Sequence, residues 1–424
     1  MEKFFRSAPN QRVLTIVALA VMVVVTGVIF WHSIGQTLAP LGATDLYPYW
    51  YHGHFVLAGE NPYRAFFEGI RMEGVPEIQP GLAIIPAYTA PLILLLSVFS
   101  LVPWADAKML WMFFNLLFTL LIPILTIKLL PQQNALSRFQ KITIFFIFFI
   151  LQGTRIANWV GQATLIVFCM MLGALLLRRE QKVLAGILLG FALSKYSLAV
   201  GVFLFLLLKR DYLILAISLI VQIFGVVIAS LLGGQPIFFT INYYFRMVTQ
   251  YSVFPGIHLA SLFPANNVVA LLLALFSTLI LGIYLWRMRR RVSETLSNSE
   301  TTLSFADWHL LSILLLWSLL VVYHRTYDTL VVIIFIVTLI YGFTQPTWWP
   351  ISAQTRQGLA LFLLFFIGMM SIPSSVMSVV FPASFMPVWY EWVSYAMTLT
   401  LIAAACLMAW LYARVVPEAS AVTG

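Results

Sequence analysis

The stretch VLTIVALAVMVVVTGVIFWH, residues 13–32, contains no Asp, Glu, Lys or Arg and decides the fold class. A helix of about 20 apolar residues crosses the roughly 30 Å hydrocarbon core of a bilayer. Lys3, Arg6 and Arg12 precede the stretch, as expected for a helix whose N-terminus stays in the cytoplasm. The run is too long for a signal-peptide core and has no clear cleavage site, so we expect a retained membrane anchor.

The composition extends this prediction to the whole chain. Hydrophobic residues make up 62% of the 424 residues and charged residues 9%, and the mean hydropathy is +0.96. Soluble domains are far less apolar, and the short alternating strands of a β-barrel are absent. We therefore predict an all-α polytopic integral membrane protein, one transmembrane domain over residues 1–424 with about 12 helices. The predicted spans lie near residues 13–32, 83–103, 107–130, 141–153, 162–178, 183–208, 212–232, 267–286, 308–323, 328–343, 358–380 and 392–413.

The net charge of +9 does not indicate a nucleic-acid partner. Basic residues lie at helix ends and in short loops, as the positive-inside rule requires, and form no stripe interleaved with aromatics. Both cysteines, Cys169 and Cys406, fall within apolar runs, which predicts neither a disulfide nor a metal site. The expected partner surface is the lipid bilayer.

The basic residues also predict an orientation. Arg287 and the arginines at 289–291 place the loop 287–307 in the cytoplasm. The aromatic loop 233–266 is then external, one span earlier. The first loop, 33–82, is external as well, because the first helix starts inside.

The middle of the chain admits two topologies. Strict alternation of spans puts the loop that contains Arg178 outside, against the positive-inside rule. Alternatively, 183–208 is a hairpin of two half-helices with both ends inside and Lys195 near its external tip, which requires another segment, such as 83–103, to be re-entrant. Both topologies bring Lys195 toward the external half of the membrane.

A polar and aromatic stretch, TDLYPYWYHGHFVLAGENPY at 44–63, follows the first span. Its carboxylate, Asp45, is costly at a lipid boundary and is a functional candidate, because it can accept a proton from a hydroxyl nucleophile there. Alternatively, Asp45 caps an amphipathic helix near 46–58 that Gly59 and Pro62 end. The neighbouring aromatics are typical of the membrane interface.

Three further ionisable residues lie on the predicted external side. Lys195 is alone in a long uncharged segment, where it either meets an anion such as a lipid phosphate or snorkels to the interface. His324 and Arg325 begin a late helix, and Arg325 alternatively pairs with Asp328 three residues further on.

Several chemistries have no support in the sequence. There is no Gly-x-x-x-x-Gly-Lys-Ser/Thr phosphate loop, no His-Glu-x-x-His zinc motif and no Gly-x-Ser-x-Gly nucleophile motif. The first loop also lacks an Asp-x-Asp pair, which argues against a metal-bound diphosphate donor.

Three stretches carry a resemblance to a known family. They are the Asp-aromatic run 44–63 that ends in Gly-x-x-Pro-Tyr, the segment 161–200 with Gly-Gln, Ala-Gly-x-x-x-Gly and a Lys, and YHRTYDTLVVIIF at 323–335. In this order they resemble the GT-C membrane glycosyltransferases, specifically the family 87 group of polyprenyl-phosphate-dependent mannosyltransferase-like proteins.

The resemblance implies a GT-C-like helical bundle with a catalytic first external loop. It implies Asp45 as the general base of an inverting displacement and Lys195, His324 and Arg325 as ligands of the donor phosphate. It also implies a polyprenyl-phosphate sugar donor, a glycolipid or glycan acceptor, and no metal cofactor. The sequence has no Trp beside His324, where many mannosyltransferase members have one, so the transferred hexosyl or pentosyl group stays open. Candidate substrate-binding residues are Tyr49, His52, Asn61, Tyr63, Arg155, Gln162, Tyr244, Arg246 and His258.

Two other functions remain open at this point. A transporter or flippase for a lipid-linked or small anionic solute would use Lys195 and Arg325 for binding, but it predicts inverted repeats that the sequence does not show. A polysaccharide polymerase or ligase would rely on late external loops, without an essential acid in the first. We expect a bacterial inner membrane, with the active site facing the periplasm.

Overall fold

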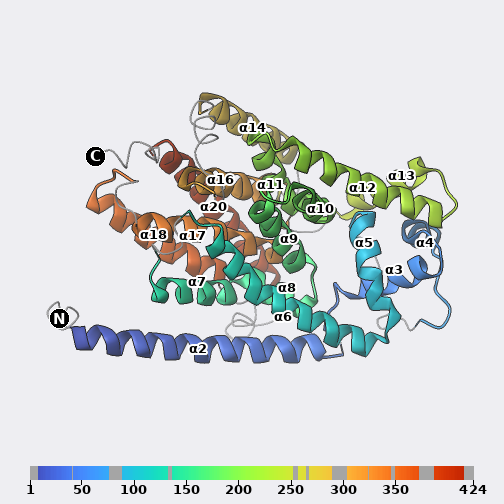
Figure 1. Ribbon diagram of the computed structural model, residues 1–424, viewed down its shortest axis with the longest axis horizontal. Coiled ribbons are helices and arrows are strands. Elements are labelled where there is room, and N and C mark those ends of the chain that lie inside the picture. Colours follow the sequence, from blue (N-terminus) through green and yellow to red (C-terminus); the bar gives the residue numbers. More distant parts are fainter. Residues whose placement is uncertain are drawn as a thin grey trace.

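The computed structural model describes residues 8–40, 42–75, 88–131, 136–251, 256–263, 267–288, 303–322, 324–344, 349–371 and 386–414. In these ranges the chain is helical and has no strand (Figure 1). Seven of the described helices are long and apolar enough to cross a membrane, or eight if one bent pair is a single span. The predicted all-α polytopic membrane fold is therefore confirmed, whereas the predicted number of helices is not.

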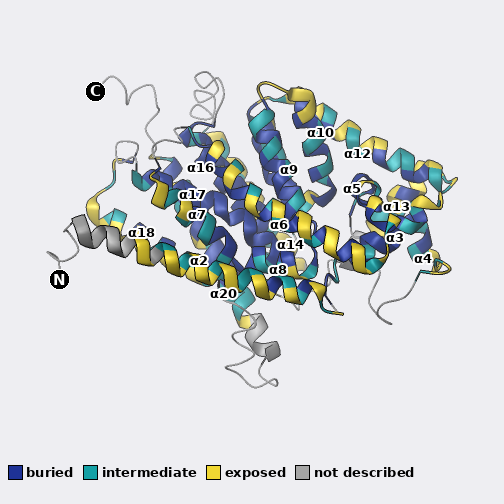
Figure 2. Ribbon diagram, turned by 60° about the horizontal axis from the view of Figure 1, so that its bottom comes forward, coloured by how far each residue is buried: buried dark blue, intermediate teal, exposed yellow. Residues whose placement is uncertain are grey.

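The long apolar helices differ in how far they are buried. The N-terminal helix α2 (Ala8–Leu38) lies at the periphery, and 6% of the residues in its most apolar stretch are buried (Figure 2). In the corresponding stretch of η5–α17 (Thr326–Thr344), 83% of the residues are buried. The long helices are α2 (Ala8–Leu38), α6 (Trp104–Lys128), α10–η3–α11 (Lys182–Leu208), α12 (Tyr212–Leu232), η5–α17 (Thr326–Thr344), α18 (Ala353–Ser371) and α20 (Met386–Tyr412). The bent pair is α7 (Arg138–Ile150) and α8 (Gln152–Val160), with an angle of 54° between them.

Three predicted spans are shorter in the structure than a full membrane helix. They are α5–η1 (Ala90–Leu101), α9 (Thr164–Leu177) and α16 (Phe305–Val321). The helix at the predicted span 267–286, α14 (Asn267–Arg287), has 21 residues. An apolar run fixes that a segment is buried in lipid or protein, but not that it crosses the whole bilayer. This is why the number of spans could not be read from hydropathy.

One end of the bundle gathers the polar connections, and we call it the Asp45 end. Here lie α3 (Tyr47–Leu57), α4 (Pro62–Glu68) and α13 (Ile237–Tyr251), on the right of Figure 1. The first residues of α6 meet the last of α2, because Lys108 Nζ donates to the carbonyl oxygen of Ala39 at 3.0 Å.

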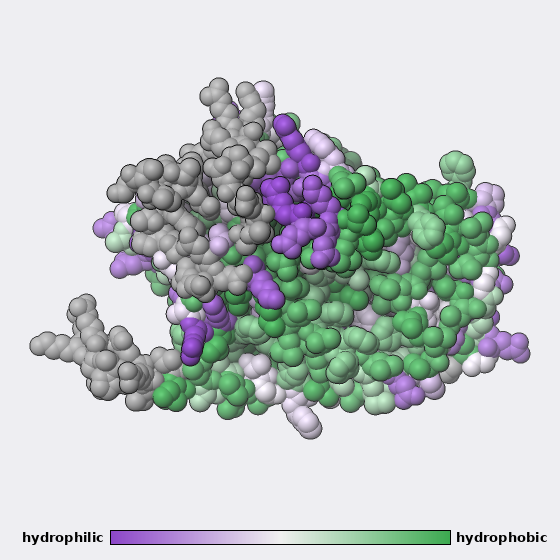
Figure 3. All heavy atoms as spheres, in the orientation of Figure 1, coloured by the Kyte–Doolittle hydropathy of each residue, from purple (hydrophilic) through white to green (hydrophobic). Residues whose placement is uncertain are grey.

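The opposite end is marked by buried charges, and we call it the Arg178 end. Arg178, after α9, lies 3.5 Å from the carboxylate of Asp211, which precedes α12. Lys209, after α11, pairs with Asp307 in the first turn of α16. Figure 3 shows a broad apolar surface between a hydrophilic cluster and the hydrophilic right-hand margin, as expected for a protein with two wet ends.

The segment Lys182–Leu208 is long enough to cross a membrane but folds back on itself. Gly186 and Gly190 of α10 (Lys182–Ala192) pack against Ile217 and Val221 of α12, respectively. Because both contacts advance in the same direction along the chain, α10 and α12 run parallel. The intervening α11 (Tyr196–Leu208) must therefore return to the Arg178 end. The structure thus has the hairpin topology, with η3 (Leu193–Lys195) at its tip, and strict alternation through this segment is wrong.

The segment 83–103 does not cross either, as far as it is described from residue 88 onward. Its two described ends both lie at the Asp45 end. Thr89 Oγ1 donates to Gln222 of α12 at 2.7 Å, and Trp50 Nε1 of α3 donates to the carbonyl of Val102 at 3.0 Å. The hairpin topology predicted this second re-entrant segment.

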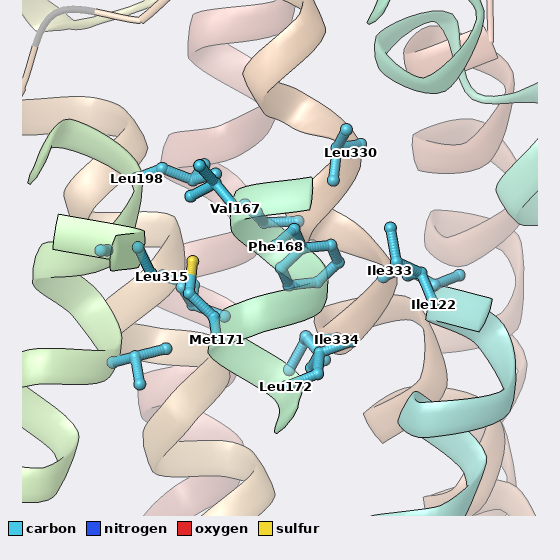
Figure 4. Close-up of a cluster of buried hydrophobic side chains, with 14 of the residues drawn as sticks. Ile122, Val167, Phe168, Met171, Leu172, Leu198, Leu315, Leu330, Ile333 and Ile334 are labelled. Atoms are coloured by element: carbon cyan, nitrogen blue, oxygen red, sulfur yellow. The ribbon is translucent and has the colours of Figure 1, made fainter. Parts of the chain in front are cut away.

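The core lies where the central helices meet. Apolar side chains from α6, α9, α11, α16, η5 and α17 converge there, among them Ile122, Phe168, Leu198 and Leu315 (Figure 4). α9 is surrounded by these helices, which brings its first residue, Thr164, next to the hairpin tip at the Asp45 end.

Candidate active site

Asp45 lies in the turn between α2 and α3, and its backbone is fixed by the end of α8. Its N–H donates to the carbonyl of Val160 at 2.8 Å, and Ala43 N donates to the carbonyl of Trp159 at 3.2 Å. The carboxylate is half-buried, and its Oδ2 accepts a hydrogen bond of 2.8 Å from Gln162 Nε2.

The alternative role of Asp45 as a helix cap is wrong. Leu46 precedes the first residue of α3, and no side chain caps this helix, because the Asp45 carboxylate turns to Gln162 instead. Gly59 does take the left-handed conformation expected after the helix, with φ of 76°. Pro62 does not end α3 but begins α4, at a position where its missing N–H costs nothing.

Gln162 is oriented by three donors to its carbonyl oxygen. Ala163 N donates at 2.8 Å, the Tyr88 hydroxyl donates a short hydrogen bond, and the Tyr49 hydroxyl lies at 3.5 Å. With its oxygen so occupied, the amide must present its NH₂ group to Asp45. Gly161 allows this placement, because it ends α8 with φ of 70°, a conformation that favours glycine.

Lys195 lies at the tip of the hairpin with 6% of its surface exposed. Its ammonium forms an ion pair with Asp328 and donates to Thr164 Oγ1 at 2.5 Å. It also lies 4.5 Å from the centre of the Tyr327 ring, a cation–π distance. Lys195 therefore does not snorkel to the interface but is held inside the protein.

Asp328 is the acid at the centre of this cluster, and it is 3% exposed. Besides Lys195, it accepts from Thr164 Oγ1 at 3.1 Å and contacts His324 Nδ1 at 3.1 Å. The backbone N–H of Arg325 also reaches it, at 3.4 Å. The predicted exposed Arg325–Asp328 pair is therefore wrong: Asp328 is buried, and its ion-pair partners are Lys195 and His324.

His324 is buried, and both of its ring nitrogens face oxygen atoms. Nδ1 faces Asp328, and Nε2 lies 3.1 Å from the carbonyl of Ser318. Neither oxygen can donate when Asp328 is ionised, so an imidazolium ring satisfies both contacts, whereas a neutral ring satisfies one. When it is protonated, His324 is a third positive group beside Lys195 and Arg325.

The loop that carries His258 packs against His324. Ile257 N donates to the carbonyl of His324 at 2.7 Å, and Ser394 of α20 donates to the carbonyl of Gly256 at 2.9 Å. Burial, together with the charge of His324, lowers the pKa of His258 to about 4. His258 is therefore a neutral group at the edge of the cluster.

The charges of the cluster act on Asp45. Burial raises the pKa of Asp45 above its usual value, and this effect is opposed by Arg325, then by Lys195, and by the hydrogen bond from Gln162. Arg325 is half-buried and so remains accessible to a ligand. A carboxylate with a raised pKa beside several cations is the arrangement expected of a general base next to an anion site.

The structure brings together some of the predicted residues and separates others. Asp45, Gln162, Tyr49, Lys195, His324, Arg325 and His258 form one cluster at the Asp45 end. Tyr63 joins its edge, because its hydroxyl donates to the carbonyl of Tyr88 at 2.5 Å, and the Tyr244 ring lies 6.1 Å from that of Tyr63.

Four predicted substrate-binding residues have structural contacts elsewhere. Asn61 caps α4, accepting from Tyr63 N at 3.0 Å, and its amide donates to Thr240 of α13 at 2.9 Å. Arg155 donates to the last carbonyl of α18, that of Ser371, at 2.8 Å. The two others pack on aromatic rings, His52 beside Tyr51 and Phe55, and Arg246 over Phe67 at 4.8 Å.

Four members of the cluster were not predicted as site residues: Asp328, Thr164, Tyr88 and Tyr327. For Asp328 a signal was present, because an acid four residues after His324 opens an otherwise apolar helix. Thr164 and the two tyrosines carry no such signal, since uncharged polar residues are common at membrane interfaces.

Comparison with known proteins identifies the family. The model of glycosyltransferase family 87 matches residues 87–306, just over half of the chain. The matched part contains Gln162, Thr164 and Lys195, whereas Asp45 and His324 lie outside it. No curated protein and no solved structure is matched. This all-α integral membrane protein therefore belongs to glycosyltransferase family 87.

Proposed function

We propose that this glycosyltransferase moves a hexosyl residue, mannosyl in the first instance, or a pentosyl residue from a polyprenyl-phosphate donor to a hydroxyl group of a lipid-linked or glycan acceptor. The observation that supports this most is the position of Asp45. Its carboxylate is held by Gln162 at 2.8 Å and lies within electrostatic range of Arg325 and Lys195. A base and a site for an anion are thus side by side.

In the proposed step, Asp45 accepts the proton of the acceptor hydroxyl as its oxygen attacks the anomeric carbon of the sugar. The bond between the anomeric carbon and the phosphate oxygen breaks, and its electron pair stays on the phosphate, which departs as polyprenyl phosphate. Attack opposite the leaving group inverts the anomeric configuration. A positioned general base contributes roughly 10²–10⁴-fold to such a rate.

The positive groups stabilise the charge that develops on the leaving phosphate. Arg325 is the accessible cation and would contact the phosphate directly, whereas Lys195 and His324 contribute from behind Asp328. Fixed cations in a site of low dielectric favour charge that appears only in the transition state. Because three side chains supply this charge, we propose that the reaction needs no metal ion.

The surroundings fit a lipid-linked donor. The cluster lies at one end of an apolar bundle, where a phosphate can meet water while a prenyl chain lies along exposed hydrophobic helices. Among these, α12 and α14 expose Phe224 and Phe276 at 63% and 60%. We propose that the Asp45 end faces the outside of a bacterial inner membrane and the Arg178 end, with exposed Arg179, Lys182 and Arg210, faces the cytoplasm.

The test uses the purified full-length protein in proteoliposomes with radiolabelled donors. Polyprenyl-phosphate mannose, the corresponding glucose and pentose donors, and the matching nucleotide sugars are offered with a lipid extract of the host as acceptor, with and without EDTA. We expect transfer from at least one polyprenyl-phosphate sugar, no transfer from nucleotide sugars, and no effect of EDTA. Transfer from nucleotide sugars alone would contradict the proposed donor class.

The same vesicles test the alternative of transport. A flippase would move the labelled lipid across the bilayer without forming a glycosylated product. Movement with no product from any donor would favour that alternative.

A further inference from the structure

We propose that Asp328 is a positioning residue that limits the positive charge of the active site, so that the site binds a singly charged phosphodiester and releases the doubly charged phosphate product. The inference rests on the proposed function for the identity of the donor. It is carried by the contacts of Asp328 with Lys195, Thr164 and His324.

Lys195 already has an anion beside it in the structure. Asp328 pairs with its ammonium, and Thr164 accepts from Lys195 and donates to Asp328, which fixes both. Asp328 and Lys195 are 3% and 6% exposed, so water screens this pair little. A donor phosphate therefore does not meet a bare lysine.

The charged groups of the whole cluster nearly balance one another. The two carboxylates of Asp45 and Asp328 offset the two fixed cations, Lys195 and Arg325. His324, whose two ring nitrogens both face oxygen atoms, supplies the surplus positive charge when it is protonated. One surplus charge matches a sugar phosphodiester, which carries a single negative charge.

The transfer reaction raises the negative charge of the lipid phosphate. When the sugar leaves, the lipid phosphate becomes a monoester, which carries nearly two negative charges at neutral pH. Asp45 is neutral after it accepts the acceptor proton, and the site returns to one surplus positive charge when Asp45 loses this proton to water. A site with one more positive charge would still match the doubly charged product at that point and would release it slowly. Asp328 removes that extra charge while holding Lys195 in place, and it disfavours a diphosphate donor for the same reason.

The structure provides a matched control for this inference. At the other end of α11, Lys209 pairs with Asp307, and both side chains are as buried as those of the Lys195–Asp328 pair, at 2% and 3% against 7% and 4%. Asp307→Asn breaks the same kind of pair at the opposite end of α11, far from the active site. It reports what the loss of a buried Lys–Asp pair does to the fold alone.

The experiment measures equilibrium binding of radiolabelled farnesyl phosphate and farnesyl diphosphate to the detergent-solubilised full-length protein. In Asp328→Asn we expect both to bind on the order of tenfold more tightly than in the wild type, because one buried negative charge is gone. Asp307→Asn is expected to lower the melting temperature without changing either affinity. Asp328→Glu, which keeps the charge, is expected to restore binding toward the wild-type value.

Two outcomes would overturn the inference. The first is farnesyl phosphate binding by folded Asp328→Asn that is unchanged or weaker than in the wild type. The second applies if Asp328→Asn does not fold. Thr164→Val loosens the pair without changing its charge and should then bind farnesyl phosphate about threefold more tightly than the wild type does. An affinity of Thr164→Val equal to that of the wild type would refute the charge limit.

The binding assay needs no turnover, so it separates this inference from the proposed function. If the wild type fails to transfer sugar from any polyprenyl phosphate but Asp328→Asn binds farnesyl phosphate more tightly, the proposed donor is wrong and the role of Asp328 stands. If transfer occurs and binding is unchanged, the proposed function stands and the role of Asp328 does not.

Discussion

At the scale of single residues, two acids next to Lys195 have different surroundings. Asp45 receives one hydrogen bond, from Gln162, and stays half-buried, and burial raises its pKa. Asp328 is enclosed by an ammonium, a hydroxyl and an imidazole. Neighbouring acids whose environments differ in this way usually have different roles. Asp45 is suited to exchange a proton with a substrate, whereas Asp328 is suited to hold its neighbours.

The pH dependence of transfer should report the surroundings of Asp45. The base must be ionised, so the rate should fall with decreasing pH through the raised pKa of Asp45, at a higher pH than for an ordinary aspartate. Gln162→Leu removes a hydrogen bond that lowers this pKa, so the acid limb of the pH–rate profile should move to higher pH. The measurement is the initial rate of transfer at a series of pH values from about 4 to about 9.

The control for this profile is Tyr49→Phe. It removes only the 3.5 Å contact to the carbonyl oxygen of Gln162, so the acid limb should stay in place. A limb that moves to lower pH in Gln162→Leu would contradict the assigned role of Gln162.

Some of the site residues could be predicted from the sequence. An ionisable group in an apolar segment is costly, which is why Asp45, Lys195 and His324 could be identified. Asp328 was placed in an exposed pair because only its local spacing to Arg325 could be read. Its true partners, Lys195 and Thr164, come from distant segments whose meeting depends on the hairpin.

At the scale of elements, the hairpin depends on two glycines of α10. A Cβ at Gly186 would lie 2.6 Å from the Cβ of Ile217, and one at Gly190 would lie 2.5 Å from the Cβ of Val221. Small residues four apart let two membrane helices approach closely. The contact is completed by Gln222, whose amide donates to the carbonyl of Gly190 at 2.6 Å. The Ala-Gly-x-x-x-Gly pattern seen in the sequence therefore has a packing role.

Gly190→Ala should destabilise the protein, because the added methyl group collides with α12 where the backbones are closest. We expect an overpacking cost of about 1–3 kcal/mol, seen as a lower melting temperature, together with weaker transfer because the tip that carries Lys195 shifts. The measurement is thermal unfolding in detergent alongside the transfer rate.

Gly282→Ala in α14 is the matched control. No atom lies within 4 Å of a Cβ at this position, so the substitution should only improve helix propensity. Equal melting temperatures of Gly190→Ala and the wild type would refute the close packing of α10 on α12.

At the scale of the whole molecule, the two ends separate two kinds of charge cluster. The Arg178 end contains Arg178, Lys209, Asp211 and Asp307 in ion pairs, and the Asp45 end contains the candidate active site. Hydropathy predicted the membrane class, but not the number of crossings, because apolar length does not distinguish a crossing helix from a short or re-entrant one. The choice between the two topologies needed the contacts of α10 with α12.

Labelling with a membrane-impermeant maleimide tests this arrangement in oriented vesicles. The background replaces the exposed Cys406 by Ser and keeps the buried Cys169. Single cysteines at Gln181 and Arg210, on either side of the hairpin, should be labelled from the same side, and a cysteine at Glu68 of α4 from the opposite side. A hairpin that instead crossed the membrane once would label Gln181→Cys and Arg210→Cys from opposite sides.

The most direct test of the central claim is sugar transfer by Asp45→Asn, compared with Asp106→Asn, an exposed acid in the first turn of α6 at the same end of the bundle. Because burial makes the ionised form of Asp45 costly in the folded state, its neutral replacement should melt at or above the wild-type temperature at neutral pH. We predict that folded Asp45→Asn loses transfer from the polyprenyl-phosphate donor by at least about 10²-fold, while Asp106→Asn keeps the wild-type rate. Transfer by Asp45→Asn at the wild-type rate would show that Asp45 is not the base and would contradict the account.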